Sequence, residues 1–178
     1  MANRFPLMIR LLHWTMAVLI LAMLFIGVGM LSTAGPAYTA LLSLHRPLGA
    51  ALFMLAVIRL SIRLQTRTPP LPDNASSLLK AVVKASHALL YGAMIAMPLI
   101  SWAMLSAGGY PVKLGPGLFL PPLVPQDLHL FGVLRLAHTL AAFAFFILIL
   151  GHISAAMIHA FIRRDGVLSA IGFGKPNA

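Results

Sequence analysis

The sequence contains no cysteine, and only 3 of its 178 residues are acidic. Without cysteine the chain cannot form disulfide bonds, iron–sulfur clusters, zinc–thiolate sites or the thioether bonds that attach c-type haem. Charged residues make up only 9% of the chain, whereas about a quarter is typical of soluble domains. These absences exclude an ordinary soluble protein, and any haem must be held by axial ligands and packing alone.

What the chain has instead is apolar sequence, with 60% hydrophobic residues and a mean hydropathy of +0.95. Basic residues number 13 against 3 acidic ones, for a formal net charge of +10. In a soluble protein this charge would suggest nucleic acid as the partner, but here the basic residues flank apolar runs. We therefore expect an integral membrane protein whose partner is the lipid bilayer and not nucleic acid.

Four apolar runs are long enough to cross a bilayer as helices. They predict helices at about 7–31, 38–64, 78–107 and 132–162. Pro47 and Pro98 fall inside the second and third runs, where proline is expected to bend a helix. The segment 108–127 holds too many glycines and prolines for a spanning helix and is expected to be a loop on the membrane surface. The sequence shows no repeat, so residues 1–178 are predicted to form a single all-α, four-helix transmembrane bundle.

The basic residues predict the orientation of this bundle, because cytoplasmic loops of membrane proteins are enriched in lysine and arginine. Ten fall on the side of the two termini, and three fall on the other side. The three are Arg46, Lys113 and Arg135. Both termini are therefore expected in the cytoplasm, with the segment 108–127 on the outer face.

The last apolar run carries His138 and His152, fourteen positions apart, with no charged residue between them. On a helix this spacing puts both imidazoles on one face, about 21 Å apart along the axis, which is most of a ~30 Å hydrocarbon core. Ionisable residues at such depth are rare and usually functional. The pair is typical of ligands for two stacked redox cofactors, such as two haems, one near each membrane surface.

The predicted depths sort the remaining histidines into possible axial pairs. His45 shares the outer half with His138, and these two form the one obvious outer pair. In the inner half, the partner of His152 is either His13 or His87. We favour His13, because the third helix is then left free to line another site.

Arginine and lysine near each pair are candidate partners for haem propionates. Arg46 and Arg135 are placed for an outer haem, and Arg10, Arg59 and Lys84 for an inner one. For any one of these residues, simple extension of the side chain to the membrane interface is an alternative interpretation.

Several motifs in order resemble the bacterial cytochrome b561 family over about residues 4–164. They are Arg10-Leu-Leu-His13-Trp14, the His45 segment with Arg59-x-x-x-Arg63 downstream, Arg67-Thr-Pro69-Pro70, His87-x-x-Leu90-Tyr91 with Pro98, and the spacing of His138 and His152. One departure is Ser101, where the family often has glycine.

The resemblance implies a di-haem b cytochrome of the bacterial inner membrane that exchanges electrons between a quinone and a partner at the outer face. It assigns His13 and His152 to one haem, and His45 and His138 to the other. Stand-alone members resemble superoxide oxidase, an oxidoreductase that takes electrons from periplasmic superoxide and reduces ubiquinone. The alternative is an anchor subunit that relays electrons between quinone and a periplasmic dehydrogenase, hydrogenase or cytochrome c. A third class is a non-redox membrane protein whose histidines conduct protons or bind metal.

Two further sites are predicted on this basis. Arg46, Lys113 and Arg135 would attract superoxide, because a positively charged surface raises the local concentration of a small anion. Quinone reduction consumes protons, and histidine titrates in the range that suits proton transfer. Once His13 and His152 bind haem, the inner half retains His87 and His159. We therefore expect these two, with Tyr91 one turn after His87, to line a quinone pocket; the alternative is that both rings only bridge neighbouring helices.

Overall fold

The computed structural model describes residues 4–66, 76–115 and 117–173. Four long helices follow one another: α1 (Leu7–Ser32), α2 (Gly35–Gln65), α3 (Ser77–Ala107) and α4 (Leu128–Met157). Between α3 and α4 lie the short strands β1 (Val112–Gly115) and β2 (Leu118–Leu120). After α4 come a π-helical turn, η1 (Ile158–Arg163), and a short helix, α5 (Val167–Ile171). The predicted four-helix membrane bundle is confirmed, while the Arg67-Thr-Pro69-Pro70 motif lies outside the described residues.

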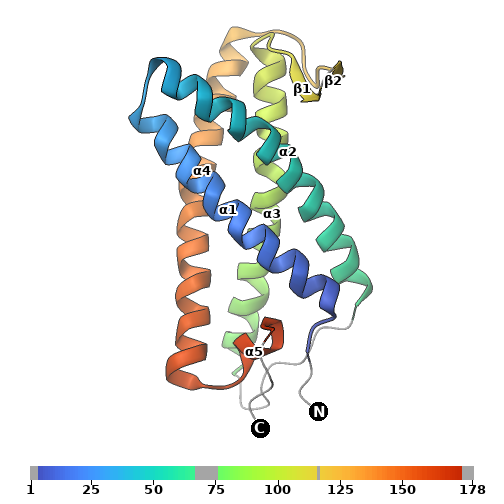
Figure 1. The fold of residues 1–178 in the computed structure, drawn as a ribbon, viewed down its shortest axis with the longest axis vertical. Helices are drawn as coiled ribbons and strands as arrows, with labels where there is room; N and C mark the ends of the chain where they lie inside the picture. The colour runs from blue at the N-terminus through green and yellow to red at the C-terminus, as the bar shows by residue number, and fades with distance from the viewer. Residues whose placement is uncertain (1–3, 67–75, 116, 174–178) are drawn as a thin grey trace.

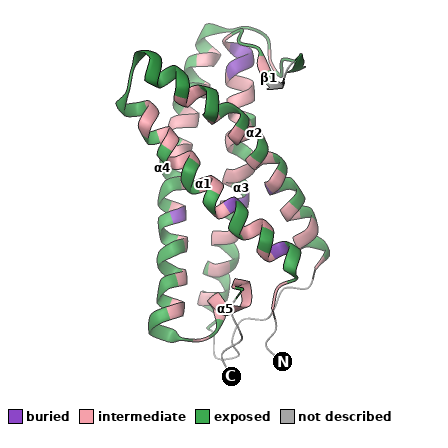
Figure 2. Cartoon of the chain, viewed as in Figure 1, coloured by how far each residue is buried: buried purple, intermediate pink, exposed green. Residues whose placement is uncertain are grey.

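All four long helices are apolar enough to cross a membrane, with α4 and η1 together forming one span of 36 residues. Only seven hydrophobic residues of the described chain are buried, and many large apolar side chains are exposed along the helices (Figure 2). In water this exposure would be costly, but hydrocarbon chains solvate such side chains. The exposed faces are therefore the lipid-facing surface of the bundle.

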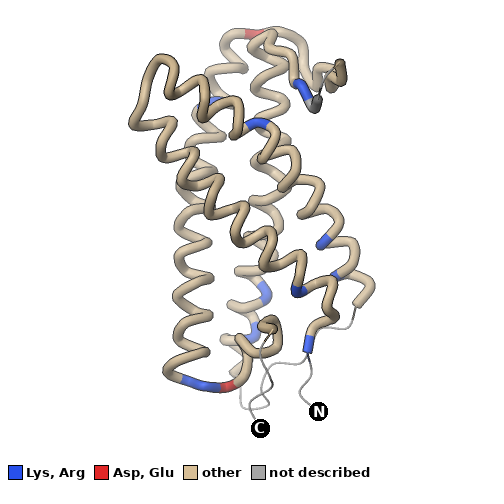
Figure 3. Tube along the Cα trace, in the orientation of Figure 1, with Lys and Arg blue, Asp and Glu red and all other residues tan. Residues whose placement is uncertain are grey.

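The bundle is built from two helical hairpins (Figure 1). α1 packs along α2, and α3 packs along α4, more extensively than α2 packs on α3. Both termini lie at the same end of the bundle, opposite the β1–β2 hairpin (Figure 1). Lysine and arginine gather mainly at the end with the termini (Figure 3), which is the distribution that the positive-inside rule uses.

Local capping explains why two helices begin earlier than the sequence predicted. α2 begins at Gly35 and not at Tyr38, because Pro36 fits the first turn, where a helix needs no backbone N–H from it. α4 begins at Leu128 and not at residue 132, because the Asp127 side chain accepts a hydrogen bond from Leu130 N at 2.9 Å. His129 consequently lies on the first turn of α4 and is exposed.

The segment 108–127, predicted as a surface loop, contains an antiparallel hairpin in which Val112 pairs with Leu120 and Lys113 with Phe119. The hairpin is tied to the end of α3. Trp102 Nε1 donates to Pro121 O at 2.9 Å, and Leu123 N donates to Ser106 Oγ at 3.0 Å. The described part of this segment is therefore attached to the end of α3.

Candidate functional site

An outer pair of histidines faces across the two hairpins. His45 on α2 and His138 on α4 have ring centroids 6.4 Å apart and ring planes at 71°. Ser101 on α3 holds His138, with Oγ 3.0 Å from Nδ1. The buried Nδ1 of His45 has no hydrogen-bond partner. The outer pair therefore has one ring fixed by a neighbouring helix and one ring without such support.

An inner cluster brings three histidines together from three helices. His13 on α1 and His152 on α4 have ring centroids 6.3 Å apart with ring planes at 74°. His87 on α3 lies closer to His152, at 5.7 Å and 84°. The Nδ1–H of His87 donates to Val83 O, one turn earlier in α3, at 2.7 Å. This hydrogen bond orients the His87 ring and leaves its Nε2 free.

The spacing of the rings tests whether haem fits these residues. Two imidazoles on opposite sides of one metal ion, each with a metal–nitrogen distance of about 2.0 Å, have ring centroids roughly 6.4 Å apart. The pairs His45–His138 and His13–His152, at 6.4 and 6.3 Å, match that value, whereas the 5.7 Å between His87 and His152 is shorter. The donors are imidazoles, the ligands of b-type haem. Both pairs therefore fit axial ligation of haem.

The inner cluster also has arginines close to it. Arg59 on α2 is near enough to His13, His87 and His152 to interact with each of them electrostatically. Its guanidinium carbon lies 5.5 Å from the centroid of the buried Tyr91 ring. The Nε atoms of Arg10 and Arg59 and the hydroxyl of Tyr91 are buried without a hydrogen-bond partner. These orphaned donors suit an anionic or carbonyl-bearing ligand, such as a propionate or a quinone.

The cations expected to attract an anion at the outer face are all exposed. Arg46 follows His45 on α2, and Arg135 precedes His138 on α4 by three residues. Lys113 on β1 lies 5.6 Å from the Phe119 ring centroid, and β1 contacts both α2 and α3. Within the described part of the chain, no contact joins Arg46, Lys113 and Arg135 to one another. They share one end of the bundle without forming a cluster.

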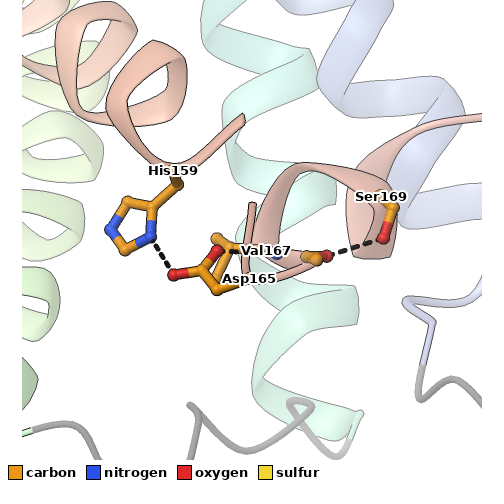
Figure 4. A network of polar contacts seen from close by, with 5 residues as sticks. His159, Asp165, Val167 and Ser169 are labelled. Carbon is orange, nitrogen blue, oxygen red and sulfur yellow. Dashed lines mark hydrogen bonds and ion pairs between the residues drawn. The ribbon is translucent and has the colours of Figure 1, made fainter. Parts of the chain in front are cut away.

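The residues expected to line a quinone pocket fall into two groups. His87 and Tyr91 lie one turn apart on α3, within the inner cluster. His159 lies in η1, where its Nδ1 is 2.6 Å from Asp165 Oδ2 (Figure 4). No described contact links His159 to His87 or Tyr91.

Sequence reasoning missed two polar partners of histidines. Ser101 was noted only as a departure from glycine, yet it contacts His138. Asp165 was not predicted as a site residue. An acidic residue at the end of an apolar helix is nevertheless a recognisable signal in a chain with only three acidic residues. Both contacts depend on chain geometry that spacing alone does not give, because Ser101 belongs to another helix and Asp165 follows an irregular turn.

Comparisons with known proteins agree with this geometry. The family model for prokaryotic cytochrome b561 matches residues 4–174. A protein of Yersinia pestis named "Probable superoxide oxidase CybB" is 28% identical over 125 residues, covering 70% of this chain and 70% of that protein. The family match takes in all four spans and all the histidines described above. The chain therefore belongs to the prokaryotic cytochrome b561 family, whose members bind b-type haem and transfer electrons in the bacterial inner membrane.

Proposed function

We propose that the chain is a single-domain di-haem cytochrome that oxidises superoxide at the outer face and reduces ubiquinone near the cytoplasmic face. The observation that carries this proposal is two histidine couples of matching ring spacing, each of which has one member on α4. His138 and His152 of α4 meet His45 and His13, respectively, at 6.4 and 6.3 Å. Bound haem would supply a one-electron redox centre at each couple. Two such centres give electrons a route between the two membrane surfaces.

For the inner couple, the ring spacing supports His13 over His87 as the partner of His152. The inner distance of 6.3 Å and angle of 74° closely match the outer couple, whereas His87 is 0.6 Å nearer to His152 than His13 is, at 5.7 against 6.3 Å. His87 is also held to Val83 O of its own helix. It is thus oriented beside the inner couple and is free for another role.

The cations of the chain serve two purposes in this proposal. Arg59 interacts with the inner histidines, and Arg10 precedes His13 by three residues on α1. Both have a buried Nε atom without a hydrogen-bond partner, and they would bind propionates of the inner haem. Arg46, Lys113 and Arg135 are exposed at the opposite end, where they raise the rate at which superoxide arrives. The comparison with the Yersinia pestis protein supports superoxide as the donor.

The quinone site is proposed at the inner end, beside His87, Tyr91 and His159. Two superoxide ions give up one electron each and leave as two dioxygen molecules, while one ubiquinone takes up two electrons and two protons. The proton uptake requires titratable groups next to the quinone oxygens. The inner half has two histidines beyond its proposed ligands, and the Tyr91 hydroxyl is buried without a partner. His87 and Tyr91 would face the quinone from α3, and His159 from η1.

The test is made on the purified protein in detergent. A redox-titrated visible spectrum is expected to show two b-type haems, with about two haems per chain by the pyridine haemochrome assay. Superoxide alone is expected to reduce both haems, and added ubiquinone to reoxidise them with steady turnover. Absence of a Soret band would contradict haem binding. Haems that superoxide does not reduce, but a co-purifying periplasmic protein does, would identify the chain as an anchor subunit.

A further inference from the structure

The turn after α4 carries a histidine–carboxylate pair that the haem couples do not use. His159 Nδ1 donates to Asp165 Oδ2 at 2.6 Å, and the two side chains are only 12% and 20% exposed. Asp127, the other acidic residue of the described chain, is occupied in capping α4. Among the described residues, Asp165 is therefore the one carboxylate that contacts a titratable side chain.

The backbone has to depart from a regular helix to form this pair. On an α-helix, a residue six positions after His159 would lie about 240° around the axis and could not reach it. Here the chain widens into the π-helical turn η1 and then reverses through Arg164 at φ 50° and Gly166 at φ 78°. A left-handed arginine is unfavourable and persists where its surroundings impose it, and π-turns are frequent at functional sites. This reversal brings Asp165 back onto His159 (Figure 4).

The returning segment is fixed to the inner site. Asp165 Oδ1 accepts from Val167 N at 3.3 Å, which fixes the carboxylate to the start of α5. α5 in turn is tied to the beginning of the chain. Phe5 N donates to Ala170 O at 3.1 Å, and Trp14 Nε1 donates to Ile171 O at 3.0 Å. Trp14 is the neighbour of His13, so these hydrogen bonds link the segment that carries Asp165 to the helix that carries His13.

This arrangement determines how the His159 ring presents its nitrogens. A carboxylate accepts the Nδ1 proton and thereby leaves Nε2 as the reactive nitrogen. In Figure 4 that second nitrogen lies on the side away from Asp165 and toward α3, which packs against α4.

We propose that Asp165 is a positioning residue that makes His159 a proton donor to quinone. This inference rests on the proposed quinone site. In the step, the Nε2–H bond of the His159 imidazolium breaks and an O–H bond forms on the quinone oxygen, while the electron comes from the inner redox centre. The neutral ring keeps its Nδ1 proton, which remains hydrogen-bonded to Asp165. A proton from the cytoplasm then restores the Nε2–H bond. The carboxylate therefore orients the ring and does not touch the quinone.

The first measurement uses the wild-type protein with bound haem and ¹⁵N-labelled histidine. The nitrogen chemical shifts of His159, assigned by comparison with H159Q, are expected to show the neutral ring protonated on Nδ1. In D165N the asparagine amide can donate to Nδ1, so the tautomer is expected to switch to Nε2–H. A wild-type ring protonated on Nε2 would overturn the proposal, whether or not any variant folds.

The second measurement is steady-state reduction of a short-chain ubiquinone by superoxide. In D165N the kcat is expected to fall about tenfold, the lower end of what loss of an orienting partner costs, with the KM for quinone unchanged. D165E is expected to recover part of the loss, because it keeps the carboxylate. D127N is the matched control at the opposite end, since asparagine also caps a helix, and it is expected to behave as wild type.

Reduction of the haems by superoxide in the absence of quinone separates the possible failures. It is expected to be normal in D165N and H159Q. If H159Q turns over quinone like the wild type, the proposed quinone site is wrong at His159, and this inference fails with it. If H159Q loses turnover while D165N keeps its kcat, the quinone site stands and Asp165 is only structural.

Discussion

The outer and inner halves of the bundle hold similar histidine couples, yet their surroundings differ. Around the outer couple, Ser101 fixes one ring, and the cations nearby are exposed. Around the inner couple lie a third histidine, the buried guanidinium Nε of Arg59 and the buried hydroxyl of Tyr91. Under the proposed function, the exposed cations of the outer half would attract the small anion that gives up the electron. The inner half has additional groups that carry protons or bind anions, as quinone chemistry requires.

The roles proposed for the two halves depend first on which half faces the cytoplasm. A topology reporter is expected to show the largest effect, because it is either silent or active. A reporter active only in the periplasm is expected to be silent after Ala178 and active when inserted at Gly115. The reason is the excess of lysine and arginine at the end with the termini (Figure 3). Activity after Ala178 would exchange the two halves and with them the assigned roles.

The two couples are expected to be lost independently. His45→Ala and His138→Ala should each remove the same one haem, and His13→Ala and His152→Ala the other, because each haem needs both axial rings. Pyridine haemochrome should then report about half of the wild-type haem, with a different component missing from the redox titration in each group. His87→Ala is the matched control within the inner cluster and is expected to keep both haems. Loss of a haem in His87→Ala, with both kept in His13→Ala, would assign the ligand to α3.

The same His87 variant tests the proposed role of the inner half in quinone reduction. His87→Ala is expected to be reduced by superoxide normally and to lose quinone turnover by about 100-fold, a typical contribution of a positioned proton donor. Rapid-mixing spectroscopy of the haems and steady-state quinone reduction measure the two steps separately. Wild-type turnover in His87→Ala would place the quinone elsewhere.

At the outer end the expected effects are smaller, because Arg46, Lys113 and Arg135 are exposed and dispersed. Replacing any one with glutamine should lower the rate of haem reduction by superoxide a few-fold and weaken its dependence on salt, as expected for electrostatic attraction. Lys80→Gln, at the cytoplasmic end, is the control and should leave that rate unchanged. A rate indifferent to all three outer substitutions and to salt would exclude electrostatic guidance at this face.

Sequence patterns predicted the bundle because membrane helices follow from hydropathy alone, and the fourteen-residue spacing placed His138 and His152 on one face of α4. The family was likewise predicted from its ordered motifs and then confirmed by the match over residues 4–174. The β1–β2 hairpin was missed, because its short strands sit among glycines and prolines that favour loops. Asp165 was missed because its contact depends on a π-turn and on an arginine in the left-handed region. Neither feature can be recognised from the sequence.

Ser101 stands where the family often has glycine, and it also contacts a histidine of the outer couple. Its Oγ lies 3.0 Å from His138 Nδ1. If His138 holds haem iron through Nε2, its Nδ1 would carry the proton and would donate it to Ser101 Oγ. Such a bond makes the ligand more electron-rich and favours the oxidised metal. Glycine at this position would remove this acceptor.

Ser101→Ala is therefore expected to give the smallest effect, an upward shift in the midpoint potential of the outer haem alone. We expect about a threefold change in the ratio of oxidised to reduced haem at fixed potential, or roughly 30 mV for a one-electron couple. The inner haem is the internal control, and Ser106→Ala, on the same helix but bonded to Leu123 N, is the external one. An unchanged outer potential would mean that the hydrogen bond with Ser101 does not determine the basicity of His138. A downward shift would mean that Ser101 donates to the ring and that Nδ1 does not carry the proton.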